Sequence, residues 1–99
     1  MEKDGNNVVQ YSGKVSGSYS GSFEMTVNFE ESRVKGTFEG GSYEVNVKGS
    51  IEDREISAEG SVIGQQVKIS GQVSEDRSTI GGEWKAPSFA SGEWNGTED

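Results

Sequence analysis

Paired acidic residues are the side chains in this sequence that come closest to a chemical site. Each pair is followed within two residues by an arginine, and the pairs are Glu30-Glu31, Glu52-Asp53 and Glu75-Asp76. Carboxylate oxygens are ligands for calcium, which takes about six to eight oxygens on one ion. The chain has no Asp-x-Asp-x-Asp spacing, and the arginines would weaken the negative field. We therefore predict no metal site.

Side chains for catalysis are scarce. The chain has no histidine and no cysteine, which removes the commonest general base, the commonest zinc ligand and all thiol chemistry. Serines are numerous, but no histidine is present to activate them and no Gly-x-Ser-x-Gly elbow occurs. We expect neither an enzyme nor a cofactor.

Composition limits the partners. The 99 residues carry a formal net charge of −8, which disfavours nucleic acid and anionic membrane surfaces because both need a basic face. No apolar run of about 18 residues is present, so we expect no membrane insertion. Charged turns favour a soluble monomer. The start of the chain lacks the apolar core of a signal peptide, so two compartments fit: the cytoplasm, or a secreted or bacterial surface protein as a mature segment.

Apolar residues alternate with polar ones along most of the chain, which is typical of strands with one buried face. From residue 9 to residue 29 they all fall on odd numbers: Val9, Tyr11, Val15, Tyr19, Phe23, Met25, Val27 and Phe29. A three-residue hairpin loop at residues 20–22, around Gly21, would keep that parity. The pattern predicts eight strands, at 9–19, 23–29, 33–38, 43–51, 56–62, 67–73, 78–84 and 90–95.

A short phrase with a central glycine recurs at steps of ten or eleven residues between Val45 and Trp94. An apolar residue stands two places before the glycine and a bulky residue two places after it, as in Ser-Thr-Ile-Gly-Gly-Glu-Trp at 78–84. We interpret the glycines as structural, because they let the sheet coil and leave room for rings from the opposite wall. The Gly-x-aromatic phrases resemble those of small antiparallel barrels, among them calycins and the barrel domains of bacterial surface lipoproteins. That resemblance transfers no residue and no activity.

Short turns make successive strands antiparallel neighbours. Inward residues that flank the turns, such as Ile51 and Ile56, lie five apart, which suggests four-residue loops. We predict an all-β, eight-stranded up-and-down meander that closes into a small barrel or a flattened, sandwich-like barrel. An open sheet would leave Tyr19, Phe38, Tyr43 and Trp84 facing water. The chain is expected to be one domain, 1–99, with flexible tails at 1–6 and 97–99.

The meander places alternate turns at opposite ends of the barrel. One end, here called the acidic end, receives both termini and the turns at 30–33, 52–55 and 74–77, with eleven acidic and four basic residues. The other, the neutral end, receives the glycine-rich turns at 20–22, 39–42, 63–66 and 85–89. Acidic turns alone are ordinary solubilising features, with a basic protein partner as the alternative.

The contrast between the ends leads to two hypotheses. The first is a non-catalytic module that recognises a protein or a glycan through neutral-end loops, with Ile63, Gln65, Pro87 and Phe89 as candidate binding residues. The alternative is a barrel that holds a small apolar ligand inside, near Trp84 and Trp94. Seven-residue strands with aromatic side chains are expected to leave little interior space. The repeat phrase turns Ala90 and Trp94 inward, whereas the five-residue step from Trp84 turns Phe89 inward, and a bulge near Pro87 would reconcile the two.

Overall fold

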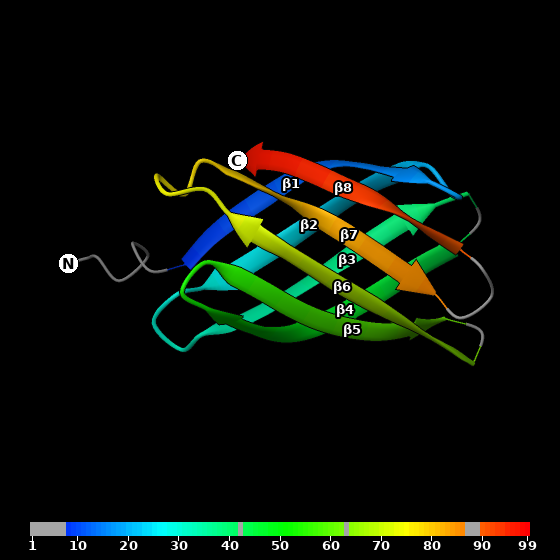
Figure 1. Cartoon of the computed structure of the whole chain (residues 1–99), viewed down its shortest axis with the longest axis horizontal. Coiled ribbons are helices and arrows are strands. Elements are labelled where there is room, and N and C mark those ends of the chain that lie inside the picture. The colour runs from blue at the N-terminus through cyan, green and yellow to red at the C-terminus, as the bar shows by residue number, and fades with distance from the viewer. Residues whose placement is uncertain (1–7, 42, 63, 87–89) are drawn as a thin grey trace.

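Eight antiparallel strands form a closed barrel, as the sequence predicts. The computed structural model describes residues 8–41, 43–62, 64–86 and 90–99. Each strand pairs with the next along the chain, and β8 closes the barrel against β1 (Figure 1). The strands are β1 (Val8–Gly17), β2 (Gly21–Asn28), β3 (Arg33–Gly40), β4 (Tyr43–Glu52), β5 (Glu55–Val62), β6 (Gln65–Val73), β7 (Thr79–Ala86) and β8 (Ala90–Glu98). The described residues include no helix that is long and apolar enough to cross a membrane.

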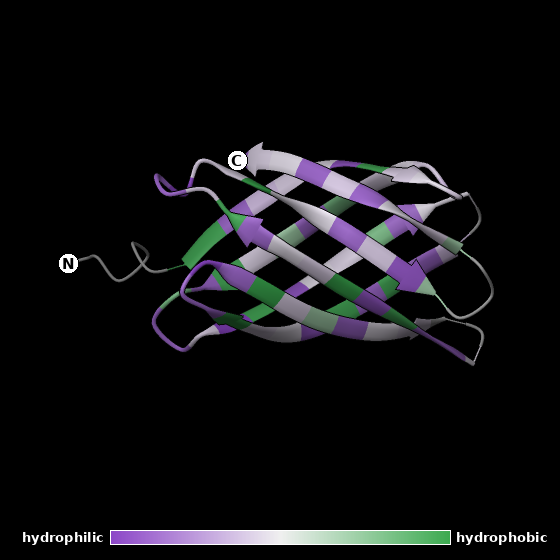
Figure 2. Cartoon of the chain, in the orientation of Figure 1, coloured by the Kyte–Doolittle hydropathy of each residue, from purple (hydrophilic) through white to green (hydrophobic). Residues whose placement is uncertain are grey.

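The alternation of apolar and polar residues fills the barrel. Polar and apolar bands follow one another along most strands (Figure 2), because successive side chains of a strand point to opposite faces. Nineteen apolar residues are buried, and no polar or charged side chain is buried in the part of the chain that the structure describes. The interior is therefore held together mainly by apolar packing, with its polar backbone groups paired in the ladders. Three buried aromatic side chains, Tyr11, Trp84 and Trp94, also donate hydrogen bonds to backbone carbonyl oxygens.

The turns sort to the two ends as predicted (Figure 1). The prediction of a flexible C-terminal tail at 97–99 is wrong, because β8 continues to Glu98. Thr97 lies opposite Thr79 of β7, and the backbone N–H of Asp99 donates to the carbonyl oxygen of Gln10 at 2.8 Å. The end of the chain is part of the barrel wall. The tail predicted at 1–6 lies outside the described residues.

Most turns are tighter than predicted. Ile51 and Ile56 lie directly opposite each other as expected, but Phe38 faces Val45 and Val73 faces Ile80. At the β3–β4 turn, β3 continues to Gly40, beyond its predicted end at residue 38. At the β6–β7 turn only the pairing shifts, since β6 ends at Val73 and β7 begins at Thr79. The described strands have eight to ten residues. The register of these two pairings differs by two residues from the prediction, which keeps the alternation of inward and outward positions along the strands.

The first hairpin turns earlier than the sequence suggests. Val15 lies opposite Gly21, so the turn is centred on Ser18 rather than Gly21. Gly17 has a φ of 112°, a conformation that favours glycine and lets the chain leave β1 at this point. Tyr19 therefore belongs to the connection rather than to a strand. It lies at the neutral end and is not enclosed by the barrel.

Candidate binding pocket

A layer of three aromatic rings fills the middle of the barrel. The Trp94 ring lies edge-on to Phe23 and Phe38, with centroids 5.2 and 5.7 Å away, and the two phenylalanines stack at 5.2 Å. Trp94 is only 1% exposed, and its indole N–H donates to the carbonyl oxygen of Glu83 at 3.1 Å. This layer closes the interior below the neutral end.

Above the aromatic layer, the described part of the chain surrounds a cavity at the neutral end. This cavity of about 280 Å³ is lined mainly by apolar side chains from six strands. Its lining comprises Val15, Tyr19, Phe38, Glu39, Gly40, Tyr43, Val45, Gln65, Val67, Ile69, Trp84, Ala86 and Ala90. The expectation of little interior space is wrong at this end, because strands of eight to ten residues extend beyond the level that the aromatic rings fill.

Trp84 forms one wall of this cavity and is fixed in place. Its indole N–H donates to the carbonyl oxygen of Ser16 at 3.0 Å. Gly92 lies opposite Trp84 on β8, and a Cβ atom on Gly92 would come within 2.6 Å of that indole nitrogen. The glycine thus leaves room for the ring. Because its one donor is already used, Trp84 offers carbon surface to the cavity.

Two tyrosines line the mouth of the cavity. Tyr19 is 45% exposed and Tyr43 is 41% exposed, although the sequence placed both inside. Their rings meet edge-to-face at 5.8 Å, and the Tyr19 ring lies 6.1 Å from that of Trp84. Rings with an apolar body and a polar tip suit such a boundary between interior and solvent.

The structure brings together only some of the predicted binding residues. Gln65 and Trp84 both line the cavity, whereas Trp94 belongs to the buried layer beneath it. Ile63, Pro87 and Phe89 lie outside the described residues. Ala90 and Trp94 are both buried, so β8 has the orientation that the repeat phrase predicts.

Tyr19, Phe38 and Tyr43 were missed as site residues, because their alternation matches that of core residues. Gly17, two residues before Tyr19, allows an earlier turn, but its positive φ is visible only in the structure.

Contacts of Arg77 connect the β6–β7 turn to residues of β1 and the β2–β3 turn at the acidic end. The guanidinium carbon of Arg77 lies 3.9 Å from the centre of the Phe29 ring, which is a cation–π contact. The hydroxyl of Tyr11 donates to the carbonyl oxygen of Arg77 at 2.8 Å. Burial, together with the negative charge of Glu98, raises the pKa of Tyr11 to about 12. This tyrosine is a structural hydrogen-bond donor at neutral pH.

Asp76 organises the β6–β7 turn beside Arg77. Its carboxylate accepts hydrogen bonds from the Ser78 hydroxyl, the Ser78 backbone N–H and the Ser74 hydroxyl, at 2.7, 3.0 and 2.8 Å. The Ser78 bonds are the larger cause of its lowered pKa, which is about 2 instead of the ordinary 3.8. Hydrogen bonds to the charged form explain this direction. Within the described residues, no three acidic side chains form a group that could hold a metal ion.

The low pKa of Asp76 predicts an acid-dependent contribution to stability. The ionised carboxylate stabilises the fold above pH 3.8, and this contribution is lost as the pH falls toward about 2. Asp76→Asn should therefore be less stable than the parent at neutral pH, with a difference that shrinks between those two values. Urea unfolding of both proteins at a series of pH values measures this difference in the free energy of unfolding. Asp53→Asn removes the same charge from the β4–β5 turn, and equal pH-dependent losses in both variants would contradict a specific role for Asp76.

No protein-family model matches the chain, and no curated protein matches its sequence.

Proposed function

We propose that this barrel is a non-catalytic binding protein that takes a small apolar ligand into the cavity at its neutral end. The observation that carries the proposal is the mainly apolar cavity of about 280 Å³ between Trp84 and the tyrosines at its mouth. Ligand sites in proteins are concave and largely apolar, with a few polar groups that orient the ligand. Gln65, Glu39 and the two tyrosine hydroxyls are the polar groups available here.

The size and lining of the cavity narrow the ligand class. The volume is close to the lower limit of about 300 Å³ for ordinary ligand pockets, which favours a single ring or a short alkyl chain. Trp84, Phe38 and Ile69 present carbon surface, so recognition rests on apolar burial, at about 25 cal/mol per Å². The polar groups lie around the mouth, which suits a ligand with one polar end directed to solvent.

Of the two hypotheses drawn from the sequence, we therefore favour the interior apolar ligand over recognition of a protein or a glycan by the loops. Recognition of a protein or a glycan by the neutral-end loops also uses this end of the barrel, and the exposed Tyr19 and Tyr43 favour it. The cavity extends into the barrel below these rings. This depth supports a small ligand better than a protein or a glycan, because recognition by surface loops alone would not require an interior cavity. An apolar side chain from a partner protein fits the same space.

Alcohols with apolar bodies are the probes for this proposal: cyclohexanol, benzyl alcohol and octanol. At least one is expected to bind with a dissociation constant between roughly millimolar and micromolar, given the small number of atoms that such ligands bury. Trp94→Phe leaves Trp84 as the single tryptophan, and its fluorescence should change on binding. Titration followed by fluorescence and by calorimetry gives the affinity.

Two variants locate the binding. Ala90→Leu fills part of the cavity and should weaken binding at least about tenfold, which corresponds to about 1.4 kcal/mol. Val8→Ala is the control for a change of apolar side-chain size away from the cavity, because Val8 is 40% exposed and begins β1 at the opposite end. Absence of binding by all three alcohols, or equal affinities for Ala90→Leu and the parent, would overturn the proposal.

A further inference from the structure

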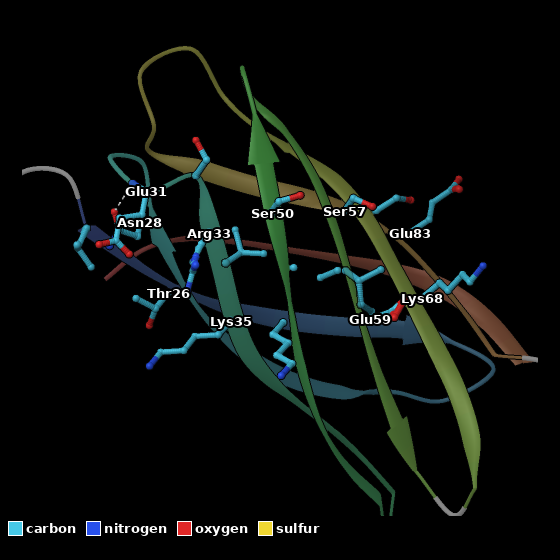
Figure 3. A pocket seen from close by; sticks show the side chains of 18 of the residues that line it. Thr26, Asn28, Glu31, Arg33, Lys35, Ser50, Ser57, Glu59, Lys68 and Glu83 are labelled. Carbon is cyan, nitrogen blue, oxygen red and sulfur yellow. Dashed lines mark hydrogen bonds between the residues drawn. The ribbon is translucent and has the colours of Figure 1, made fainter.

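Four of the six lysines lie on one row across the outer face of the barrel. Lys35 on β3 is directly opposite Lys48 on β4, and Lys68 on β6 is directly opposite Lys85 on β7. Glu59 on β5 stands between Lys48 and Lys68. All five side chains are exposed, and they line a groove of about 1320 Å³ on this face (Figure 3). We name this set the lysine row.

The lysine row is unusual for so acidic a chain. Like charges directly opposite on neighbouring strands destabilise a sheet, and the row contains two such pairs. With a net charge of −8, the chain has acidic residues in excess that could have alternated with these lysines. Instead, the row holds four ammonium groups against one carboxylate. An anionic ligand along the row would relieve the repulsion within both pairs.

The surroundings of the row offer hydroxyl and amide groups. On the side toward the acidic end, Ser50, Ser57 and Ser70 form the next row on β4, β5 and β6. Arg33 on β3 and Glu83 on β7 stand at the two ends of this row, and all five residues line the groove. On the side toward the neutral end, the hydroxyl of Thr37 donates to the amide oxygen of Asn46 at 3.0 Å. Such groups donate and accept hydrogen bonds, as recognition of sugar hydroxyls requires.

A protein partner fits this face less well. Protein interfaces centre on buried aromatic residues and arginines, and lysine is depleted in them. Among the described residues that line the groove there is no aromatic side chain, and Arg33 is the single arginine. Nucleic acid is also disfavoured, because its closely spaced phosphates would meet Glu59 in the middle of the row. The chemistry of the face therefore favours an acidic carbohydrate.

The order of charges along the row specifies that carbohydrate further. Neighbouring strands are about 4.8 Å apart, so the two lysine pairs are centred three strand steps apart, about 14 Å measured along the curved sheet. Each pair can bind one carboxylate through two ammonium groups. Glu59 between them repels negative charge but accepts hydrogen bonds from hydroxyls. We propose that the outer face of β3–β7 binds an acidic polysaccharide in which carboxylate sugars alternate with neutral sugars.

The test uses a hexasaccharide of alternating glucuronate and N-acetylglucosamine with the full chain. It is expected to bind with amide shift changes at Lys35, Lys48, Lys68 and Lys85 in NMR spectra, and the affinity should fall as salt is added. Lys48→Gln and Lys68→Gln should each weaken binding about tenfold. Both variants should fold, because the lysines are exposed and each change relieves a like-charge pair. Lys14→Gln, on β1 and outside the groove, removes the same charge and should leave binding unchanged.

Competing ligands make the test decisive. A uniform galacturonate hexamer should bind more weakly than the alternating chain in the parent, and Glu59→Gln should improve its binding several-fold while changing that of the alternating chain less than about twofold. Three results would overturn the proposal. The first is the absence of amide shift changes along the lysine row. The second is an equal loss of binding affinity in Lys14→Gln and Lys68→Gln. The third is tighter binding of a glutamate hexapeptide, which would assign the row to an acidic protein. None of them bears on the cavity at the neutral end.

Discussion

Replacing Trp94 with alanine is expected to lower the free energy of unfolding by about 3–5 kcal/mol, the range for large aromatic residues in packed cores. The ring contacts Phe23 and Phe38 and lies against the wall at Gly71, where a Cβ atom would come within 2.6 Å of a ring carbon. Its removal leaves a cavity in the middle of the barrel. It also removes a hydrogen bond to the carbonyl oxygen of Glu83.

Such a loss is a large part of the total stability of a domain of this size, which is about 5–15 kcal/mol. Urea denaturation followed by circular dichroism measures it. Trp94→Phe is the matched control, because a smaller ring preserves the edge-to-face packing with Phe23 and Phe38 and should lose less than half as much. A loss below about 1 kcal/mol in Trp94→Ala would show that the ring does not fill the core in solution.

Replacing Gly82 with alanine is expected to cost about 3 kcal/mol, the upper part of the range for overpacking. Gly82 faces inward on β7, opposite Trp94 on β8 and Gly71 on β6. A Cβ atom there would collide with the carbonyl oxygen of Ser70 and the Cα atom of Gly71. Both are backbone atoms of the neighbouring strand, so relief requires the strands to move apart and their hydrogen bonds to lengthen.

Gly81 provides a control from the same strand. It faces outward, and the nearest atoms to a Cβ there are the Trp94 carbonyl oxygen at 3.0 Å and the Cβ of Asn95 at 3.2 Å. Gly81→Ala has the same change in chain entropy as Gly82→Ala but requires only small shifts, so its loss should be several-fold smaller. Thermal and urea unfolding of the two variants compare the losses directly. Equal losses would mean that the inward glycines are not needed for close approach of the strands.

The order of strands could be predicted from the sequence because two simple patterns agree. The period of two identifies the inward residues, and the short spacing between strands forces antiparallel neighbours. The same patterns sort the turns, so the contrast between an acidic and a neutral end was also visible. The number and order of the strands follow from them, whereas the closing of the barrel was predicted from the need to bury large inward side chains.

The register could not be predicted, because parity does not change when a pairing shifts by two residues. Phe38 opposite Val45 or opposite Tyr43 leaves the same side chains inside. The choice between Gly17 and Gly21 for the first turn is invisible for the same reason. The shift in register and the earlier first turn leave Tyr19 at the mouth of the neutral-end cavity. The candidate site therefore depends on features that the sequence pattern does not determine. The lysine row is equally hidden, since its members align only in the true register.

The proposed cavity can be tested most directly by locating a bound ligand through methyl NMR. With saturating octanol, nuclear Overhauser effects are expected between ligand protons and the methyl groups of Val45, Val67 and Ile69, which line the neutral-end cavity. None is expected to Val27 or Val73, which are buried near the acidic end. Contacts to these two residues, or no contacts to the first three under saturating conditions, would contradict the assignment of the binding site.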